Sequence, residues 1–276
     1  MQTPENAPNL APLADAPQPP TALRRTIAPA WHTVVLIAGI LALSVAGRAS
    51  LSIQHAMPNR IVTYTTTAIF ELAMLGWVAL GLRLRKVPLR SLFGAVPGDM
   101  RSVARDFGIA LVFWIGSLMI LGTMGIFWSS VEGAVTHRQT LAHAGQPFSP
   151  TPSQKQTLKA LEELAPENGE QIAGWVLLCL LVGLVEETVF RGYLQSQFTA
   201  WAHGGAAAGV VFSALLFGAA HGYQGVRNMV LLTVFGALLS LLALFRRSLR
   251  SCIFAHSWHD LIAGLALGVL RSHHLL

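Results

Sequence analysis

Long apolar runs alternate with short polar segments over most of the chain. Each run is long enough to cross about 30 Å of hydrocarbon as an α-helix. The runs lack the alternation of polar and apolar residues that is typical of strands in an outer-membrane barrel. We therefore predict an all-α fold, a polytopic membrane helical bundle of about seven transmembrane helices, with six to eight as the range. The predicted spans are Trp31–Gly47, Ile61–Leu82, Phe107–Trp128, Ile172–Phe190, Ala206–His221, Asn228–Phe245 and Cys252–Leu270.

Composition and charge agree with a membrane protein. Of the 276 residues, 53% are hydrophobic and 12% are charged, whereas about 25% of residues in a soluble domain are charged. Most of the net charge of +6 lies in loops between the predicted spans, including one basic loop from Arg83 to Arg105, so it predicts no nucleic-acid-binding patch. The basic groups are Arg24, Arg25, Arg83, Arg85, Lys86, Arg90, Arg101, Arg105, Arg246, Arg247 and Arg250. Counting spans puts them on one side, which the positive-inside rule makes cytoplasmic, with the N-terminus inside and the C-terminus outside.

Three regions are expected along the chain. Residues 1–30 are rich in Pro, Ala and Asn and predict a disordered cytoplasmic tail. Residues 31–170 hold the first spans and a polar extracytoplasmic loop, 129–170, in which Ser153–Leu164 is predicted to form a short amphipathic helix. Residues 171–276 form a membrane core that carries most of the polar residues within spans.

The stretch LVGLVEETVFRGYLQ places three charges at the end of an apolar run. Glu187 and Arg191 are four residues apart and can pair on one helix face. Glu186 has no partner in its own helix and shares a face with Gly183, where the missing side chain leaves room for water or a substrate backbone. A buried carboxyl group in that setting is suited to accept a proton. The alternative is that both glutamates lie at the membrane interface and the span ends early.

Two further segments place polar groups in apolar spans. In ALLFGAAHGYQG, Phe217 lies four residues before His221 and could fix the orientation of its ring. In SCIFAHSWHDLIAG, His256 and Asp260 are four residues apart and share a face, while His259 is expected to be a decoy at a helix interface. Ionisable residues inside a membrane helix are functional candidates by default, although His221 could also be interfacial.

Together these segments place a carboxyl group, two histidines and a further carboxyl group in three spans. Such groups converge only if the helices surround a polar cavity. Water, a carboxylate and imidazoles in that cavity favour hydrolysis, most plausibly of a peptide bond.

The three motifs, E-E-x-x-x-R, F-x-x-x-H and H-x-x-x-D, resemble in this order those of the CAAX protease and bacteriocin-processing family (CPBP or Abi), which includes the type II CAAX prenyl endopeptidases. The resemblance covers roughly Gly174 to Leu270. It implies a glutamate-dependent intramembrane protease in which Glu186 activates water with help from His221. Glu187 and Arg191 complete the first motif, and His256 and the residue at position 260 stabilise the oxyanion.

Asp260 departs from the family, whose prenyl endopeptidases usually have asparagine at this position. An ionised Asp260 cannot donate a hydrogen bond and would repel an oxyanion. It must be protonated, orient His256 from behind, or help to hold a metal. Glu186, His221 and His256 could ligate zinc, but we favour a site without a metal or other cofactor.

Depth along the membrane raises a difficulty for this site. Span counting puts Glu186 and His256 in the cytoplasmic half but His221 near the outer end of its span. The groups can meet only if the GYQG segment, with Gly222 and Gly225, breaks a short or re-entrant helix. Non-helical backbone is tolerated at membrane depth where it lines a cavity.

The favoured function is an endopeptidase of a bacterial inner membrane that acts on a secreted peptide or a membrane protein. Prenylated C-termini, leader peptides and membrane-protein tails all remain possible substrates, and the sequence leaves the oligomeric state open. The alternatives are an inactive partner-binding or immunity protein, a proton-coupled transporter, and a cysteine peptidase that uses Cys252 beside His256. Against the transporter, the two halves of the chain lack paired short spans.

Overall fold

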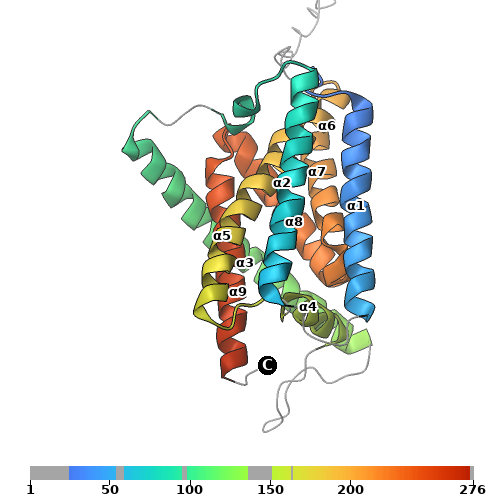
Figure 1. The fold of residues 1–276 in the computed structure, drawn as a ribbon, viewed down its shortest axis with the longest axis vertical. Helices are drawn as coiled ribbons and strands as arrows, with labels where there is room; N and C mark the ends of the chain where they lie inside the picture. The colour runs from blue at the N-terminus through green and yellow to red at the C-terminus, as the bar shows by residue number, and fades with distance from the viewer. Residues whose placement is uncertain (1–24, 54–58, 95–97, 136–150, 163, 274–276) are drawn as a thin grey trace, which may run out of the picture.

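The computed structural model describes residues 25–53, 59–94, 98–135, 151–162 and 164–273. Within these ranges the regular secondary structure is helical, which confirms the all-α fold (Figure 1). The helices are α1 (Ala30–Ile53), α2 (Arg60–Leu84), η2 (Leu89–Phe93), α3 (Met100–Val135), α4 (Pro152–Glu162), α5 (Gly169–Glu186), η3 (Glu187–Leu194), α6 (Gln195–Trp201), α7 (Ala206–Ala220), η4 (Gly222–Gln224), α8 (Val226–Arg246) and α9 (Arg250–Ser272).

Six helices within the described ranges are long and apolar enough to cross a membrane. The exception among the predicted spans is the fifth, because α7 has only 15 residues and is therefore about 22 Å long at 1.5 Å per residue. It cannot cross about 30 Å of hydrocarbon alone. The chain is thus an integral membrane protein with six candidate spans, at the lower end of the predicted range, and one shorter apolar helix.

A buried carboxylate links the two arginine-rich regions at one end of the bundle. Asp106 of α3 has no exposed surface, and it pairs with Arg246 at the end of α8 and with Arg250 at the start of α9. Arg105 lies in the first turns of α3, so the basic segment assigned to a loop continues into this helix. This link ties α3 to the last two helices. The side of the membrane on which it lies stays a prediction.

The structure corrects two of the expected segment boundaries. Gln197 of α6 accepts hydrogen bonds from the backbone N–H groups of Ile27 and Ala28 and donates one to the Ala28 carbonyl, so the end of the predicted tail is docked. Residues 1–24 lie outside the described ranges. The loop predicted to start at residue 129 starts later, because α3 continues to Val135, and its short helix is α4 rather than Ser153–Leu164.

The long helical segment Gly169–Trp201, composed of α5, η3 and α6, lies at the centre of the bundle. It packs against α2 on one side and α9 on another, and the α7–α8 hairpin covers a third (Figure 1). Close helix contact with α9 depends on Gly183, since a Cβ atom there would lie 2.2 Å from Ser257 Oγ. The polar motifs of three helices are thereby brought together.

Candidate active site

The first motif lies where the central helix changes its hydrogen-bond pattern. Glu186 ends α5, and Glu187 begins the eight-residue π-helix η3, which contains Arg191. At the end of η3 the N–H of Gln195 donates to the carbonyl of Phe190, five residues earlier. π-Helical turns are rare and are frequently found at functional sites. This one carries two charged side chains, Glu187 and Arg191, into the interior of the bundle directly after Glu186.

The predicted ion pair between Glu187 and Arg191 is present, with 2.8 Å between Glu187 Oε1 and Arg191 Nη1. Both side chains are fully buried. The guanidinium of Arg191 also lies 4.2 Å from the centre of the Phe217 ring, and its Nη2 donates to the carbonyl of Gly236. Such cation–π and hydrogen-bonding contacts fix the arginine between η3, α7 and α8.

His256 connects both glutamates. Its Nδ1 donates to Glu187 Oε1 at 2.7 Å, a contact that the sequence analysis missed. On the other side of the ring, Nε2 lies 3.7 Å from Glu186 Oε2 and 3.5 Å from Asp260 Oδ2. Of the roles considered for Asp260, orienting His256 from behind is therefore wrong, because Glu187 occupies that position. Asp260 instead lies on the same side of the imidazole as Glu186.

His221 stands at the end of α7, where Phe217 holds it in two ways. Nδ1 donates to the backbone carbonyl of Phe217 at 2.8 Å, and the two ring centres are 4.8 Å apart. The packing predicted for this pair is thus confirmed. A carbonyl only accepts hydrogen bonds, so Nδ1 carries a proton and Nε2 remains for water or substrate. The ring of His256 lies against the same phenyl group at 5.7 Å, which puts both imidazoles around Phe217.

The break that was predicted at the GYQG segment is present after α7. The helix ends at Ala220, and η4 with its following Gly225, at φ +97°, turns the chain into α8. A positive φ of this size is natural only for glycine. Because α7 is short, His221 does not need to reach the outer surface. The amphipathic helix α4 lies against this turn, and Thr157 Oγ1 donates to the Gln224 carbonyl.

The expectation that Gly183 leaves room for water beside Glu186 is wrong. Its open face is filled by Ser257 of α9, as the overlap with an added Cβ demonstrates. The glycine therefore permits close packing of α5 and α9. This packing brings His256, the residue before Ser257, up to the two glutamates.

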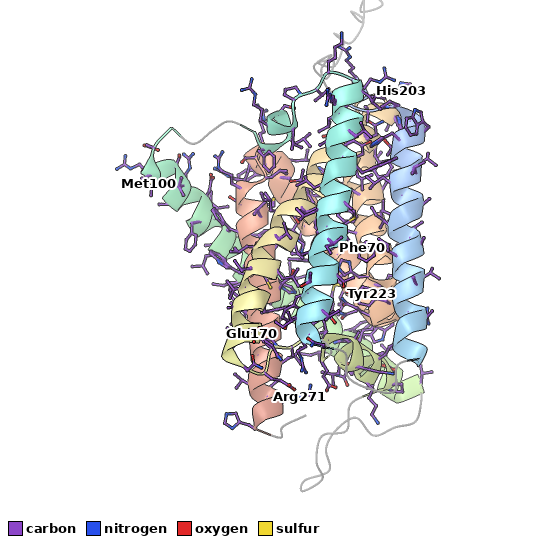
Figure 2. The ribbon with its side chains drawn as sticks, in the orientation of Figure 1. Phe70, Met100, Glu170, His203, Tyr223 and Arg271 are labelled. Carbon is purple, nitrogen blue, oxygen red and sulfur yellow. The ribbon has the colours of Figure 1, made fainter. Side chains whose placement is uncertain are left out.

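Two residues of the site were missed by sequence reasoning. Glu71 of α2 is buried, and α2 packs against α5 and η3, the elements that carry Glu186 and Glu187. Tyr223 in η4 stacks on His221, with 6.2 Å between the ring centres, and Figure 2 labels it in the lower half of the bundle. The sequence could have indicated Glu71, because it is a single acidic residue inside an apolar span.

The other candidates lie away from this chemistry. His259 packs against Phe235 of α8, with 4.7 Å between the ring centres, as expected for a residue at a helix interface. Cys252 is completely buried, and its thiol donates to the carbonyl of Leu239. A thiol held in this way is not available as a nucleophile, which argues against the cysteine-peptidase alternative.

No three His, Cys, Asp or Glu side chains within the described residues are grouped so that they could hold a metal ion. Glu186, His221 and His256, the set considered for zinc, therefore do not form a ligand group in this arrangement. A site that works without a metal stays a prediction.

Comparison with known families bears on the same region. Residues 168–262 match the family model described as type II CAAX prenyl endopeptidase Rce1-like. These residues, named here the Rce1-like domain, are similar to that family. The match confirms the resemblance inferred from the three motifs, and it supports a membrane-embedded protease of the CAAX endopeptidase type. No curated protein and no solved structure matches the chain.

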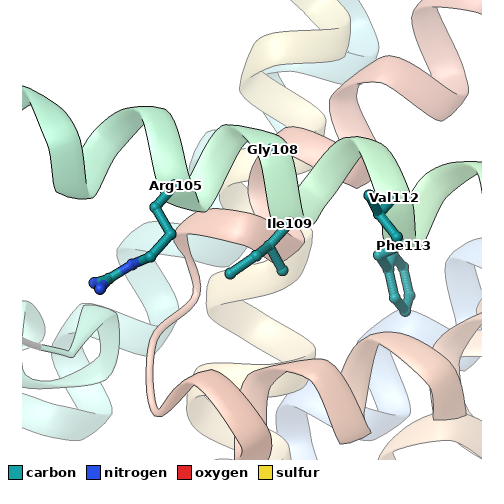
Figure 3. Close-up of a pocket in the computed structure, with 5 residues that line it drawn as sticks. All are labelled: Arg105, Gly108, Ile109, Val112 and Phe113. Atoms are coloured by element: carbon teal, nitrogen blue, oxygen red, sulfur yellow. The ribbon is translucent and has the colours of Figure 1, made fainter.

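The Rce1-like domain contains both glutamates of the first motif and the residues of the other two motifs. Glu71 lies outside it, in the N-terminal third of the chain. A surface cavity of about 430 Å³ along α3, shown in Figure 3, also lies outside this domain, and it is lined by Arg105, Gly108, Ile109, Val112 and Phe113. None of the candidate catalytic side chains lines that cavity.

Proposed function

We propose that the protein is an intramembrane endopeptidase that hydrolyses a peptide bond with a water molecule activated by Glu186 and His221. The observation that carries the proposal is the approach of Glu186 and Asp260 to Nε2 of one buried imidazole, His256, whose other nitrogen is held by Glu187. The match to the CAAX endopeptidases supports the same reaction class.

In this scheme the carboxylate of Glu186 accepts a proton from water as the water oxygen attacks the carbonyl carbon of the substrate. Nε2 of His221 accepts a hydrogen bond from the same water and orients it. His256 carries a proton on each ring nitrogen in this step: Nε2–H donates to the developing oxyanion, while Nδ1–H stays bonded to Glu187, which holds the ring in place. The proton on Glu186 then passes to the leaving nitrogen, and the C–N bond breaks to give a carboxylate and an amine.

Asp260 takes part on the oxyanion side in this proposal. Its carboxyl group helps only if it donates a hydrogen bond, since an ionised carboxylate would repel the oxyanion. An asparagine at position 260 could donate this hydrogen bond through its side-chain amide without needing to be protonated first. This leads to a test by substitution, given in the Discussion.

The substrate class that we propose is a secreted peptide or a membrane protein, cleaved within the bilayer or at its surface. The proposed location is the inner membrane of a bacterium, with the arginine-rich end of the bundle in the cytoplasm. The charge pattern supports this orientation, because Arg246 and Arg250 join Asp106 at the end that also carries Arg105.

Comparative peptidomics would test the function. Membranes and medium from cells that produce the wild-type protein should contain peptide termini that are missing when Glu186 is replaced by glutamine. Glu167→Gln is the matched control, because Glu167 is a partly exposed acid paired with Arg60 away from the site, and it should give the wild-type peptides. Identical peptides from wild type and Glu186→Gln would favour an inactive partner-binding protein.

A further inference from the structure

Tyr223 is a side chain of the site to which the proposed reaction assigns no role. It belongs to η4, the short turn after α7, and follows His221 by two residues (Figure 2). The planes of the two rings are 28° apart, and their centres are separated by 6.2 Å. This separation lies within the range of about 4.5–7 Å at which aromatic rings attract each other.

His221 depends on such a contact because its own helix holds the ring at one atom only. Nδ1 donates to the carbonyl of Phe217 at 2.8 Å, and the helix ends here, since His221 is the C-cap of α7. A single hydrogen bond allows a ring to tilt about that bond. The ring of Phe217 contacts the imidazole with 4.8 Å between centres, at an angle of 50°. Tyr223 adds a second aromatic contact, so the plane of the imidazole is restricted by both rings.

The phenol of Tyr223 is itself anchored to two helices. Its oxygen accepts a hydrogen bond from Nε2 of Gln224 at 2.9 Å. The side-chain oxygen of this buried glutamine accepts one from Asn228, in the first turn of α8, at 2.6 Å. The backbone carbonyl of Gln224 accepts from Thr157 of α4. Tyr223 is therefore tied to the start of α8 and to the amphipathic helix α4.

The α1 helix supports the same turn. A Cβ atom added at Gly47 would lie 3.4 Å from Cβ of Tyr223, so the backbone of α1 lies directly against this residue. Ser44 Oγ donates to the carbonyl of Ala219 at 2.8 Å, two residues before His221. Both α1 and α4 lie outside residues 168–262. The N-terminal part of the chain thus contributes to the geometry around His221.

We propose that Tyr223 is a positioning residue of the peptidase site, whose ring holds the imidazole of His221 so that Nε2 faces the attacking water. The hydroxyl group of Tyr223 anchors the ring and exchanges no proton in the reaction. The catalytic meaning of this role rests on the proposed function. The orientation of the imidazole, however, is a property of the folded protein and can be measured without a substrate.

Two substitutions separate the ring from the hydroxyl group. Tyr223→Phe keeps the ring and loses only the hydrogen bond from Gln224, so its kcat should stay close to that of wild type. Tyr223→Leu removes the ring, and the loss of an aromatic pair corresponds to about a 2- to 12-fold fall in kcat. KM should change little in both variants, because His221 binds the water rather than the substrate in the proposed reaction.

Phe212→Leu is the matched control, because it removes an aromatic contact from α7 at a distance from His221. Phe212 lies nine residues before His221, is 55% exposed and pairs with Phe198 at 5.8 Å between ring centres. Its kcat and KM should equal those of wild type. A similar loss of Tm in Phe212→Leu and Tyr223→Leu would show that lowered stability alone does not reduce turnover.

Nitrogen NMR of protein with labelled histidines, in detergent micelles, measures the imidazole independently of turnover. The His221 signal is assigned by its absence from His221→Gln. In wild type it should show one tautomer, with the proton on Nδ1. The signal should be the same in Tyr223→Phe and Phe212→Leu. In Tyr223→Leu it should shift or broaden, because the ring adopts more than one orientation.

Gly47→Leu tests the role without changing either residue. The added side chain would press on Tyr223 from α1, so the His221 signal should shift and kcat should fall while KM stays unchanged. This variant also decides the matter if Tyr223→Leu does not fold.

Several results would overturn the proposal. If the His221 signal is unchanged in Tyr223→Leu or Gly47→Leu, Tyr223 does not hold the imidazole, and any loss of turnover in Tyr223→Leu comes from contact with the substrate. Wild-type kcat in Tyr223→Leu would remove the catalytic role. Equal impairment of Tyr223→Phe and Tyr223→Leu would assign the role to the hydroxyl group instead. If the wild-type protein cleaves nothing but the NMR signals behave as expected, the proposed function fails while the contact between Tyr223 and His221 stands.

Discussion

Replacing Glu187 by leucine should destabilise the protein strongly, because Arg191 would lose its partner in a fully buried place. Removing one member of a buried ion pair typically costs about 3–5 kcal/mol. Arg191 would keep its hydrogen bond to the Gly236 carbonyl and its contact with the Phe217 ring. We therefore expect the lower end of that range, about 3 kcal/mol. Glu187→Gln, which keeps one acceptor oxygen, should cost about 1–2 kcal/mol.

The double variant Glu187→Leu/Arg191→Leu makes this prediction sharper. Replacing both charges by apolar side chains leaves no unpaired ion, and such exchanges are often close to neutral. Its free energy of unfolding should therefore lie nearer to wild type than that of Glu187→Leu. Activity should nevertheless stay about 10- to 150-fold below wild type, because Nδ1 of His256 has lost its acceptor.

The assay is reversible unfolding in detergent micelles, combined with turnover measured on the same preparations. Glu167→Leu is the matched control, since Glu167 is 42% exposed although its partner Arg60 is only 7% exposed. It should cost less than Glu187→Leu, because water reaches the guanidinium of Arg60 when Glu167 is removed. Single-variant costs below about 1 kcal/mol, or a double variant as unstable as the sum of both single variants, would refute the reasoning about the buried pair.

Three further predictions concern the site, the packing and the orientation. Removing an oxyanion donor lowers kcat by about 10²–10³, so Asp260→Ala should be severely impaired, whereas Asp260→Asn should keep most of its activity. A chelator should have little effect on the wild-type enzyme. Loss of activity on chelation, with recovery on adding stoichiometric zinc, would instead indicate a metalloprotease. Gly183→Ala should lower Tm, because the added Cβ would clash with both Oγ and the backbone N of Ser257. Adding Ser257→Ala to this variant should recover only part of the lost Tm, because the backbone contact remains. An unchanged Tm in Gly183→Ala would contradict the close packing of α5 and α9. In intact cells, an impermeant thiol reagent should label the variant Lys155→Cys but not Arg90→Cys. The native Cys179 and Cys252 are buried and should not react. The reverse labelling pattern would show that the orientation in the membrane is the opposite of the predicted one.

The sequence predicted the helical architecture because apolar runs of sufficient length leave a membrane protein few alternatives. It also predicted the Glu187–Arg191 pair and the contact of Phe217 with His221, since both depend on four-residue spacing within one helical segment. In contrast, the contact of Glu187 with His256 joins positions 69 residues apart, and periodicity contains no information about it.

Two errors arose from assigning one role to one residue type. Gly183 suggested space for water, but a glycine in a membrane helix equally permits a close neighbour, and here Ser257 takes the space. Glu71 was overlooked because no motif surrounds it. An isolated acid in an apolar span has to face a polar site somewhere in the fold, and only the packing of α2 against α5 shows which site.

The most direct test of the account is the turnover of purified Glu186→Gln on a cleaved substrate, with its melting temperature measured alongside. The carboxylate of Glu186 is proposed as the group that removes the proton of water, and an amide cannot do this. The account predicts that hydrolysis falls to background while Tm stays near that of wild type, since Glu186 contacts His256 only at 3.7 Å and has no ion pair as short as that of Glu187. Full turnover by a folded Glu186→Gln protein would contradict the proposed mechanism.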